Sequence, residues 1–426
     1  MNLKFIKKLL VPLFLKGSGM FISFISMFII INIYSLEIFG KYAQSVSFLL
    51  FLSGIASFGY PQSIFRDSAL MNFFQKKKLF NQMFLNNVCI SILISPILIL
   101  FFYFIEGLNV YQIMILIFIF WLMATSRLRF SLLRTTKHVK YAEVPEQIVK
   151  PLILVISILL LPKDDINSLY IALFLGLLSA FVVNHFFLKR YYTLPSKFEI
   201  NKELININIK NTNTQLWISN VLILFKDFIE LFMIGFLLGD LISGEYKIIL
   251  QVYVVLMAVF NTMALINSMS FAKLIALKKY SEVNKKALSE MAPSLMILTL
   301  IIFVLILAET IFKVSDYMQL SEVALYSILI FMMFSIINIA IGPITQLLLH
   351  SRQIKKIILM TTIRVLSVCF SALLANITSP LYQILIFTIC LLFAETIVLL
   401  FAARSLYFSI GYISPIYQKL ILRTKK

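Results

Sequence analysis

Apolar residues in this chain are gathered into blocks of about 20, and short polar stretches separate the blocks. An α-helix needs about 20 apolar residues to cross a bilayer, whereas the strands of a membrane barrel would alternate over about ten residues. The pattern therefore predicts an all-α polytopic membrane protein of about twelve transmembrane helices. We expect spans at residues 14–36, 42–65, 79–105, 109–133, 142–161, 167–188, 214–238, 246–270, 290–312, 323–348, 357–377 and 381–403.

The positive charges test this topology independently, because Lys and Arg are enriched in cytoplasmic loops. Of the 38 Lys and Arg residues, 31 lie on one side by this topology, in the termini, in every second loop or at the adjoining ends of the spans. The opposite loops hold only Lys41, Lys163, Lys247 and Lys313. The distribution predicts that both termini are cytoplasmic, and a missed or invented span would have broken the alternation.

Composition excludes several classes of protein. The chain has 426 residues, 61% hydrophobic and only 13% charged, whereas a soluble protein carries about 25% charged residues. The net charge of +19 does not indicate a nucleic-acid partner, because the basic residues are spread between the apolar blocks. We expect no metal and no cofactor. The three cysteines lie in apolar blocks, the three histidines share no ligand spacing, and no G-x-x-x-x-G-K-[ST] loop occurs.

The chain is expected to consist of two halves with the same orientation. We place an N-terminal six-helix half at 1–195, a cytoplasmic connector at 196–213 and a C-terminal six-helix half at 214–426. The segments Ile38-Phe39-Gly40-Lys41-Tyr42 and Ile242-Ser243-Gly244-Glu245-Tyr246 are 204 residues apart and open corresponding spans. Both are interpreted as G-x-Y turns on the non-cytoplasmic side. Transporters built from parallel halves bind their substrate near the midplane and rock the halves to alternate access.

Three charged residues in the seventh span form the strongest candidate site. Lys226, Asp227 and Glu230 lie near its middle, spaced so that their side chains share one helix face. An ionisable residue at the bilayer centre costs about 3 kcal/mol on insertion scales, so it usually faces a cavity or a partner. The three residues are interpreted either as a cavity-lining functional cluster or as an ion-pair network that joins helices.

Other spans also carry charges. Glu395 lies near the middle of the twelfth span. It is interpreted either as a proton or cation carrier or as a hydrogen-bonding partner of a neighbouring helix. Arg364 lies about eight residues into the eleventh span, which favours a cavity-lining role over snorkelling. Lys150, between Pro145 and Pro151, is close enough to the cytoplasm to snorkel.

Lys16, Arg66 and Arg134 are expected at cytoplasmic helix ends, where topology alone explains them. Together with Lys150 and Arg364 they would place positive charge on the cytoplasmic half of a central cavity. An anionic head group from the inner leaflet would be attracted to that charge.

Short motifs along the chain carry a family resemblance. They are Lys16-Gly17-Ser18, Phe39-Gly40-Lys41-Tyr42, Gly59-Tyr60 with Arg66-Asp67, Asp227 ahead of Met233-Ile234-Gly235, Gly244-Glu245-Tyr246, and Gly342-Pro343 with Leu347-Leu348-Leu349. In these motifs the chain resembles the polysaccharide-transport branch of the multidrug/oligosaccharidyl-lipid/polysaccharide (MOP) exporter superfamily, in particular the O-antigen flippases. The resemblance spans nearly the whole chain.

The resemblance implies a V-shaped bundle of two halves in the bacterial inner membrane. The implied function is not enzymatic: the protein would flip an undecaprenyl-pyrophosphate-linked oligosaccharide from the cytoplasmic to the periplasmic leaflet. By position, Arg66, Lys150, Lys226 and Arg364 would meet the pyrophosphate or acidic sugars, and Asp227, Glu230 and Glu395 would be coupling or gating carboxylates. The implied partners are this lipid-linked oligosaccharide, membrane lipid and other membrane proteins of polysaccharide assembly.

Four alternatives remain open. The first is a drug or small-solute exporter of the same superfamily. A major-facilitator exporter would carry G-x-x-x-D-x-x-G-R-R after the second span, where this chain reads Arg66-Asp67-Ser68-Ala69-Leu70. A membrane-embedded polysaccharide polymerase is disfavoured because the outer loops are short. In a non-transporting scaffold, the midplane charges could be replaced by apolar residues without loss of function.

Overall fold

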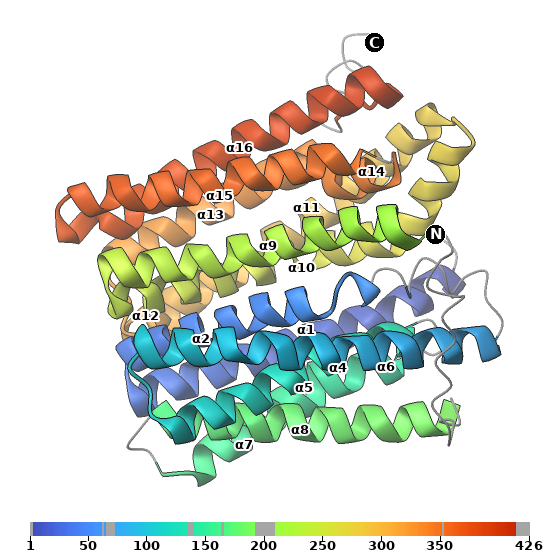
Figure 1. The fold of residues 1–426 in the computed structure, drawn as a ribbon. Coiled ribbons are helices and arrows are strands. Elements are labelled where there is room, and N and C mark those ends of the chain that lie inside the picture. The colour runs from blue at the N-terminus through green and yellow to red at the C-terminus, as the bar shows by residue number, and fades with distance from the viewer. Residues whose placement is uncertain are drawn as a thin grey trace. The chain divides into compact units, whose positions relative to one another are not determined.

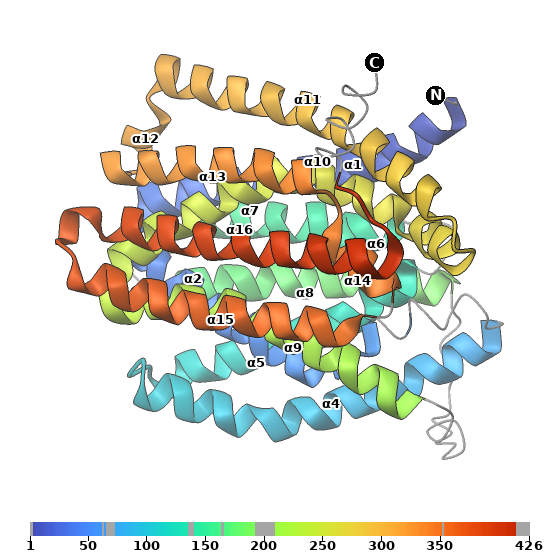
Figure 2. The same ribbon diagram turned by 90° about the horizontal axis from the view of Figure 1, so that it is seen from above.

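The computed structural model describes residues 3–61, 64, 73–134, 140–162, 166–191, 209–351 and 353–414. Within these ranges every regular element is a helix, as predicted (Figures 1 and 2). The elements are α1 (Leu3–Tyr34), α2 (Leu36–Ala56), α4 (Phe73–Phe104), α5 (Val110–Arg134), α6 (Lys140–Val144), η2 (Pro145–Val149), α7 (Lys150–Leu160), α8 (Ile166–Tyr191), α9 (Ile209–Leu238), α10 (Asp240–Ala276), α11 (Tyr280–Phe312), α12 (Val314–Tyr317), α13 (Glu322–Ile341), α14 (Ile344–His350), α15 (Ile354–Ile377), η4 (Pro380–Tyr382) and α16 (Gln383–Ile410).

Ten segments of the described residues are long and apolar enough to cross a membrane. The predicted spans 142–161 and 214–238 are not among them, although both regions are helical. The first is divided into α6, the π-helix η2 and α7, so no single helix there is long enough. The second lies within α9, a continuous helix whose apolar sequence is interrupted by Lys226, Asp227 and Glu230.

The chain divides into two compact units, Met1–Phe228 and Ile229–Lys426, and the division falls inside α9. The predicted connector at 196–213 lies mostly outside the described residues, and α9 begins within it at Ile209.

In the first unit, α5 is the central helix. It packs on α2, α4 and α8, while α7 packs on α8 and α1 packs on α7 and η2. Phe48 of α2 stacks on Phe101 of α4 with ring centroids 3.8 Å apart and lies 5.0 Å from Phe228 of α9. Aromatic pairs of this kind add about 1 kcal/mol each to the burial of their area.

In the second unit, α10 packs on α11, α13 and α14, and α16 packs on α13 and α15. Figures 1 and 2 both show α15 and α16 running side by side. The chain turns sharply after α13 at Gly342, whose φ of 101° suits only glycine, and Pro343 follows at the start of α14.

The two units repeat the same arrangement. The packing of α5 on α2, α4 and α8 corresponds to that of α13 on α10, α11 and α16. The residue before α2, Ser35, has φ 98° and ψ 160°, and the residue before α10, Gly239, has φ 101° and ψ 160°. These positions are 204 residues apart, the spacing of the two G-x-Y motifs.

The G-x-Y tyrosines also occupy equivalent places. Tyr42 contacts Tyr170, the fifth residue of α8, and Tyr246 contacts Phe387, the fifth residue of α16. The motifs lie inside the first turns of α2 and α10, and Ser35 and Gly239 form the sharp junctions before them. The prediction that the motifs themselves are turns was therefore wrong in detail, because the strained backbone lies five residues earlier.

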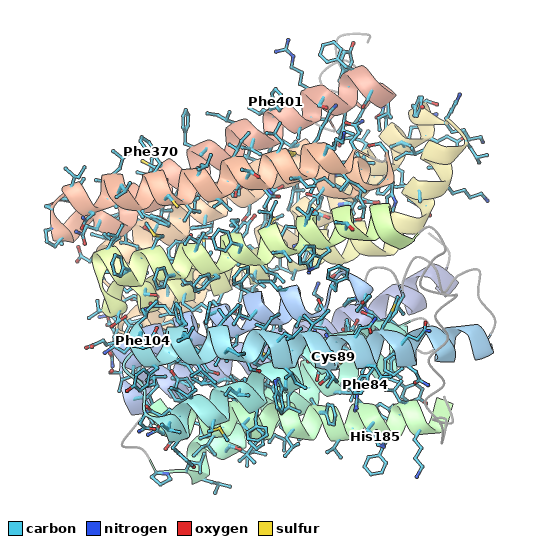
Figure 3. The ribbon with its side chains drawn as sticks, in the orientation of Figure 1. Phe84, Cys89, Phe104, His185, Phe370 and Phe401 are labelled. Atoms are coloured by element: carbon cyan, nitrogen blue, oxygen red, sulfur yellow. The ribbon has the colours of Figure 1, made fainter. Side chains whose placement is uncertain are left out.

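The outward faces of the helices are apolar. Phe104, Phe370 and Phe401 are 73%, 62% and 58% exposed and project away from their helices (Figure 3). Exposed apolar surface on this scale is unfavourable in water and favourable in hydrocarbon. It therefore supports membrane insertion of the helices that carry it.

Candidate functional site

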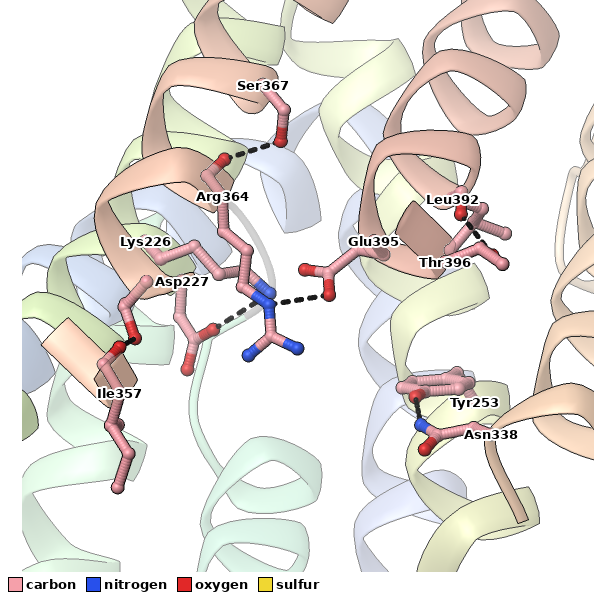
Figure 4. Close-up of polar contacts among 11 residues, drawn as sticks. Lys226, Asp227, Tyr253, Asn338, Ile357, Arg364, Ser367, Leu392, Glu395 and Thr396 are labelled. Carbon is pink, nitrogen blue, oxygen red and sulfur yellow. Dashed lines mark hydrogen bonds and ion pairs between the residues drawn. The ribbon is translucent and has the colours of Figure 1, made fainter. Parts of the chain in front are cut away.

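Arg364 and Glu395 form an ion pair in the second unit. The Nε of Arg364 in α15 lies 2.7 Å from Oε2 of Glu395 in α16, and the two side chains are only 19% and 11% exposed (Figure 4). Arg364 is ten residues from the start of α15, which is about 15 Å along the helix. The pair therefore lies deep within the lengths of both helices, where an unpaired charge would be most costly.

The geometry leaves part of Arg364 uncommitted. Glu395 contacts Nε, and the two terminal nitrogens of the guanidinium point away from this carboxylate in Figure 4. A planar guanidinium can bind a phosphate or carboxylate through two parallel hydrogen bonds. In the same unit, the amide of Asn338 in α13 donates to the hydroxyl of Tyr253 in α10 at 3.1 Å (Figure 4).

Glu230 is buried in the core of the second unit. Its side chain is 2% exposed, and its Oε1 accepts a hydrogen bond from the hydroxyl of Tyr246 in α10. Tyr246 in turn packs against Phe387 in an edge-to-face arrangement with centroids 5.1 Å apart. Glu230 therefore helps to hold α9 against α10 in this unit.

Lys226 and Asp227, one turn earlier in α9, belong to the first unit. Their charged groups lie 3.5 Å apart, with Lys226 22% and Asp227 60% exposed (Figure 4). Asp227 is thus open to solvent or substrate, whereas Glu230 is enclosed. The three side chains, predicted to share one helix face, thus have different surroundings, because Glu230 bonds to Tyr246 in the core while Asp227 is exposed.

Lys150 lies where η2 gives way to α7. Pro151 has no N–H to donate to the carbonyl of Gln147, and the N–H of Lys150 bonds instead to the carbonyl of Pro145, five residues back. The freed Gln147 carbonyl packs against Gly19 of α1, where a Cβ would lie only 2.5 Å away. π-Turns of this kind are frequent at functional sites. The side chain of Lys150 is half-buried.

The structure brings together Arg364 with Glu395 and Lys226 with Asp227. Glu230 has a separate partner, and Lys150 lies in the first unit. Arg66 is outside the described residues.

A second charged region lies near the predicted cytoplasmic end of the first unit. Arg134 of α5 contacts a single oxygen of Glu143 in α6, from Nε at 2.9 Å and from Nη2 at 2.7 Å. Nearby, the amide of Asn184 in α8 donates to Glu146 in η2 at 3.5 Å. Arg134 therefore has a structural partner, in agreement with its interpretation as a helix-end residue.

Two arginines that the charge distribution counts as topology signals are inside α5. Arg129 is 8% exposed, and its guanidinium lies 3.6 Å from the ring centroid of Phe181 in α8. Arg127 lines a pocket with residues that follow α2 and with Asn220 of α9. The predicted span 109–133 already contained both arginines, but the sequence did not indicate what each of them contacts.

Glu290 of α11 is a further buried carboxylate that the sequence pattern did not single out. It is 2% exposed, and the side chain of Asn267 in α10 lies beside its carboxylate. The amine of Lys286, one turn earlier, lies 5.9 Å from the ring of Phe271. Elsewhere in the described chain, no group of three His, Cys, Asp or Glu residues could hold a metal ion.

The sequence matches the family described as "Polysaccharide biosynthesis protein" over residues 5–270. A comparison with curated protein sequences gives no match.

Solved structures of MOP transporters have the same fold. An inward-facing multidrug resistance MATE family transporter of the MOP superfamily aligns with a TM-score of 0.66 at 11% identity, covering 94% of each chain. A MATE structure in complex with Br-NRF aligns with a TM-score of 0.64 at 13% identity, covering 95% of this chain and 96% of that one.

A MOP superfamily transporter from Pyrococcus furiosus aligns with a TM-score of 0.62 at 11% identity, covering 93% of this chain and 97% of that one. These likenesses confirm the predicted fold class, an all-α polytopic membrane protein in two six-helix halves.

Proposed function

Because the chain belongs to the polysaccharide biosynthesis protein family, we propose that it is a flippase for an undecaprenyl-pyrophosphate-linked oligosaccharide. Its fold is that of a multi-pass MOP-superfamily transporter. The substrate would be a repeat unit of O-antigen or a similar surface polysaccharide, carried from the cytoplasmic to the periplasmic leaflet. The proposed location is a bacterial inner membrane.

The observation that carries the proposal is the family match over residues 5–270 on a transporter fold. A transporter that serves polysaccharide synthesis must move the sugar intermediates made at the membrane. Such an intermediate is an amphipathic anion with a lipid tail, a charged phosphate linkage and a polar glycan. Moving its polar part through about 30 Å of hydrocarbon needs a path lined by the protein.

The Arg364–Glu395 pair supports this substrate class. In the proposed mechanism, the terminal nitrogens of Arg364 bind a phosphate oxygen while the carboxylate of Glu395, 2.7 Å from Nε, balances the charge of the guanidinium. Protonation of Glu395 would weaken the ion pair and let Arg364 move with its ligand. A proton or another cation that exchanges at Glu395 would then link an ion gradient to substrate movement.

The other predicted residues take related roles in the proposal. Lys150 and Lys226, together with Arg66, would contact the pyrophosphate or acidic sugars along the path. Lys226 would exchange its ion pair with exposed Asp227 for the anionic substrate, and Asp227 would then bind a cation. Glu230, bonded to Tyr246, would act as a gating carboxylate between α9 and α10.

The proposal includes no enzymatic step. Other membrane proteins of polysaccharide assembly, proposed as partners, would catalyse the reactions on the oligosaccharide. A drug or small-solute exporter is the competing function, since several structural relatives are multidrug transporters. The Pyrococcus furiosus relative is described by a "reverse polarity of binding pocket" that suggests a different function. Pocket charge therefore differs between proteins of this fold, and a cationic path favours an anionic substrate here.

The proposal is tested by deleting the protein from its native cell and measuring lipid-linked oligosaccharide and surface polysaccharide. We expect the lipid-linked intermediate to accumulate on the inner leaflet, surface polysaccharide to disappear, and the intact chain to restore both. Normal surface polysaccharide, in a strain with no second flippase, would favour small-molecule export instead.

A further inference from the structure

A pocket with one arginine in its lining lies wholly in the first unit. It has a volume of about 220 Å³ and is lined by Ser57, Pro61, Arg127, Phe130, Ser131 and Asn220. These residues come from the C-terminal end of α2 and the residues after it, from α5 and from the early part of α9. The volume corresponds to about seven water molecules at ~30 Å³ each, enough for a phosphate group with some solvent.

Arg127 is the one charged residue among those that line the pocket. No described residue forms a hydrogen bond or an ion pair with its guanidinium, and its electrostatic neighbour is Glu146 of η2. This distinguishes it from Arg134, which Glu143 holds, and from Arg129, which is stacked on Phe181.

The sequence makes room for this guanidinium. A Cβ at Gly54 of α2 would lie 3.4 Å from Nη1 of Arg127 and 2.1 Å from a methyl of Leu224 in α9. Glycine at this position therefore lets α5 and α9 approach α2 closely.

The pocket contains the groups that an oxyanion needs. An arginine stays charged at all physiological pH values and has five N–H donors, so a sheltered guanidinium is stabilised by water or by an anion. Asn220 supplies an amide to the same pocket. The hydroxyls of Ser57 and Ser131 now donate to the carbonyls of Gly54 at 2.8 Å and Arg127 at 3.0 Å, and rotation would redirect them.

We propose that this pocket is an oxyanion subsite that binds a phosphate or pyrophosphate group through Arg127 and Asn220. Arg127 is about two turns from Arg134, at the end of α5 that the charge distribution assigns to the cytoplasm. The subsite is thus suited to the first capture of an anionic group on the cytoplasmic side. The inference rests on the proposed function only where it names a lipid pyrophosphate as the source of that group.

The chain contains a built-in reporter for the subsite. Trp217 donates from Nε1 to the carbonyl of Ile55 at 3.2 Å, and its ring centroid lies 4.9 Å from that of Phe58. Two pocket residues are close to Trp217. Ser57 lies between Ile55 and Phe58 in the sequence, and Asn220 is one helical turn after Trp217. The chain has only one other tryptophan, Trp121, so a Trp121→Phe background leaves Trp217 as the sole indole.

The experiment titrates the full-length Trp121→Phe protein in nanodiscs with inorganic pyrophosphate and, separately, with farnesyl pyrophosphate. Trp217 fluorescence and equilibrium dialysis of labelled ligand are both measured. We expect saturable binding that Arg127→Gln weakens tenfold or more and that Asn220→Leu weakens less. Arg404→Gln is the matched control, because it removes the same charge from an exposed position in the second unit.

Each outcome decides a separate point. The subsite would be overturned if Arg127→Gln and the parent protein bound pyrophosphate with equal affinity in dialysis. It would also be overturned if neither protein bound either ligand. If Arg127→Gln does not fold, binding by Asn220→Leu that equals the parent's would overturn it as well. Farnesyl pyrophosphate binding tenfold tighter than inorganic pyrophosphate would identify a lipid head group as the source, and equal affinities would identify free phosphate compounds. If binding depends on Arg127 but the protein moves no lipid-linked sugar, the subsite stands and the flippase function is rejected. If the protein moves lipid-linked sugar but binding does not depend on Arg127, the flippase function stands and the subsite is rejected.

Discussion

Arg364 of α15 and Glu395 of α16 are joined by a 2.7 Å ion pair that is largely shielded from the surroundings. Two functions are compatible with such a pair. It can hold two neighbouring helices together, or it can keep a guanidinium ready for an anionic ligand and release it when the carboxylate is protonated. The two functions differ in what happens when both charges are removed at once.

Replacing one partner alone is expected to destabilise the protein. Arg364→Leu or Glu395→Leu should each cost about 3 kcal/mol, because an uncompensated charge is left between α15 and α16. The double variant should recover most of this loss, because no buried charge remains, but should not transport. Thermal unfolding in detergent and transport in vesicles are measured on all three variants. Recovery of transport in the double variant would mean that the pair is only structural.

Asp227→Asn is expected to leave the fold intact and to abolish transport. Asp227 is 60% exposed and its contact with Lys226 is 3.5 Å, so the pair should contribute less than about 1 kcal/mol to stability. Glu37→Gln is a suitable control, since it removes a similarly exposed carboxylate that is paired with Lys41 at 3.3 Å in α2. Normal transport by Asp227→Asn would show that this carboxylate has no role in coupling.

Replacing Glu230 and replacing Tyr246 are expected to have opposite effects on stability and transport. Tyr246→Phe removes the donor to a buried carboxylate and should cost about 2 kcal/mol of stability. Glu230→Gln keeps an acceptor for Tyr246, so it should cost less stability but should lose transport if Glu230 is a gating carboxylate. Unfolding and transport of both variants are compared. If the two variants lose transport in proportion to their loss of stability, Glu230 serves only to hold α9 to α10.

The repeated helix junctions predict stability changes of opposite sign. Ser35 and Gly239 have nearly the same dihedral angles, in a region that glycine alone enters freely. Ser35→Gly should stabilise by about 1 kcal/mol, since its cap bond to the Ile38 amide is long at 3.4 Å. Gly239→Ser should destabilise by about 1–3 kcal/mol. Thermal unfolding checks both, and changes of the same sign would contradict the equivalence of the junctions.

Much of the fold follows from the sequence, since block length and Lys/Arg alternation predicted the helices, and the motif repeated after 204 residues predicted two halves. The fifth predicted span is broken by η2 for a local reason, the missing N–H of Pro151. The partial repeat in sequence is also a repeat in structure. Ser35 and Gly239 have matching dihedral angles, and Tyr42 and Tyr246 occupy equivalent places.

The sites were less predictable, because sequence spacing along one helix does not identify the partner on another. Nothing near Arg364 in the sequence indicates Glu395, and nothing near Glu230 indicates Tyr246. Arg127 was assigned to topology because basic residues cluster around it, although it faces the pocket beside Gly54. Charge counting treats all helix-end arginines alike, while packing separates those with partners from those without.

The most direct test of the central claim is a flipping assay with the purified protein in sealed vesicles. A fluorescent undecaprenyl-pyrophosphate-linked oligosaccharide is placed in one leaflet, an ion gradient is imposed, and its loss from that leaflet is followed with a sugar-binding quencher. We predict rapid flipping by the intact protein and at least a tenfold slower rate in the Arg364→Leu/Glu395→Leu variant. No flipping under either a proton or a sodium gradient, while a cationic drug is transported by the same vesicles, would contradict the account.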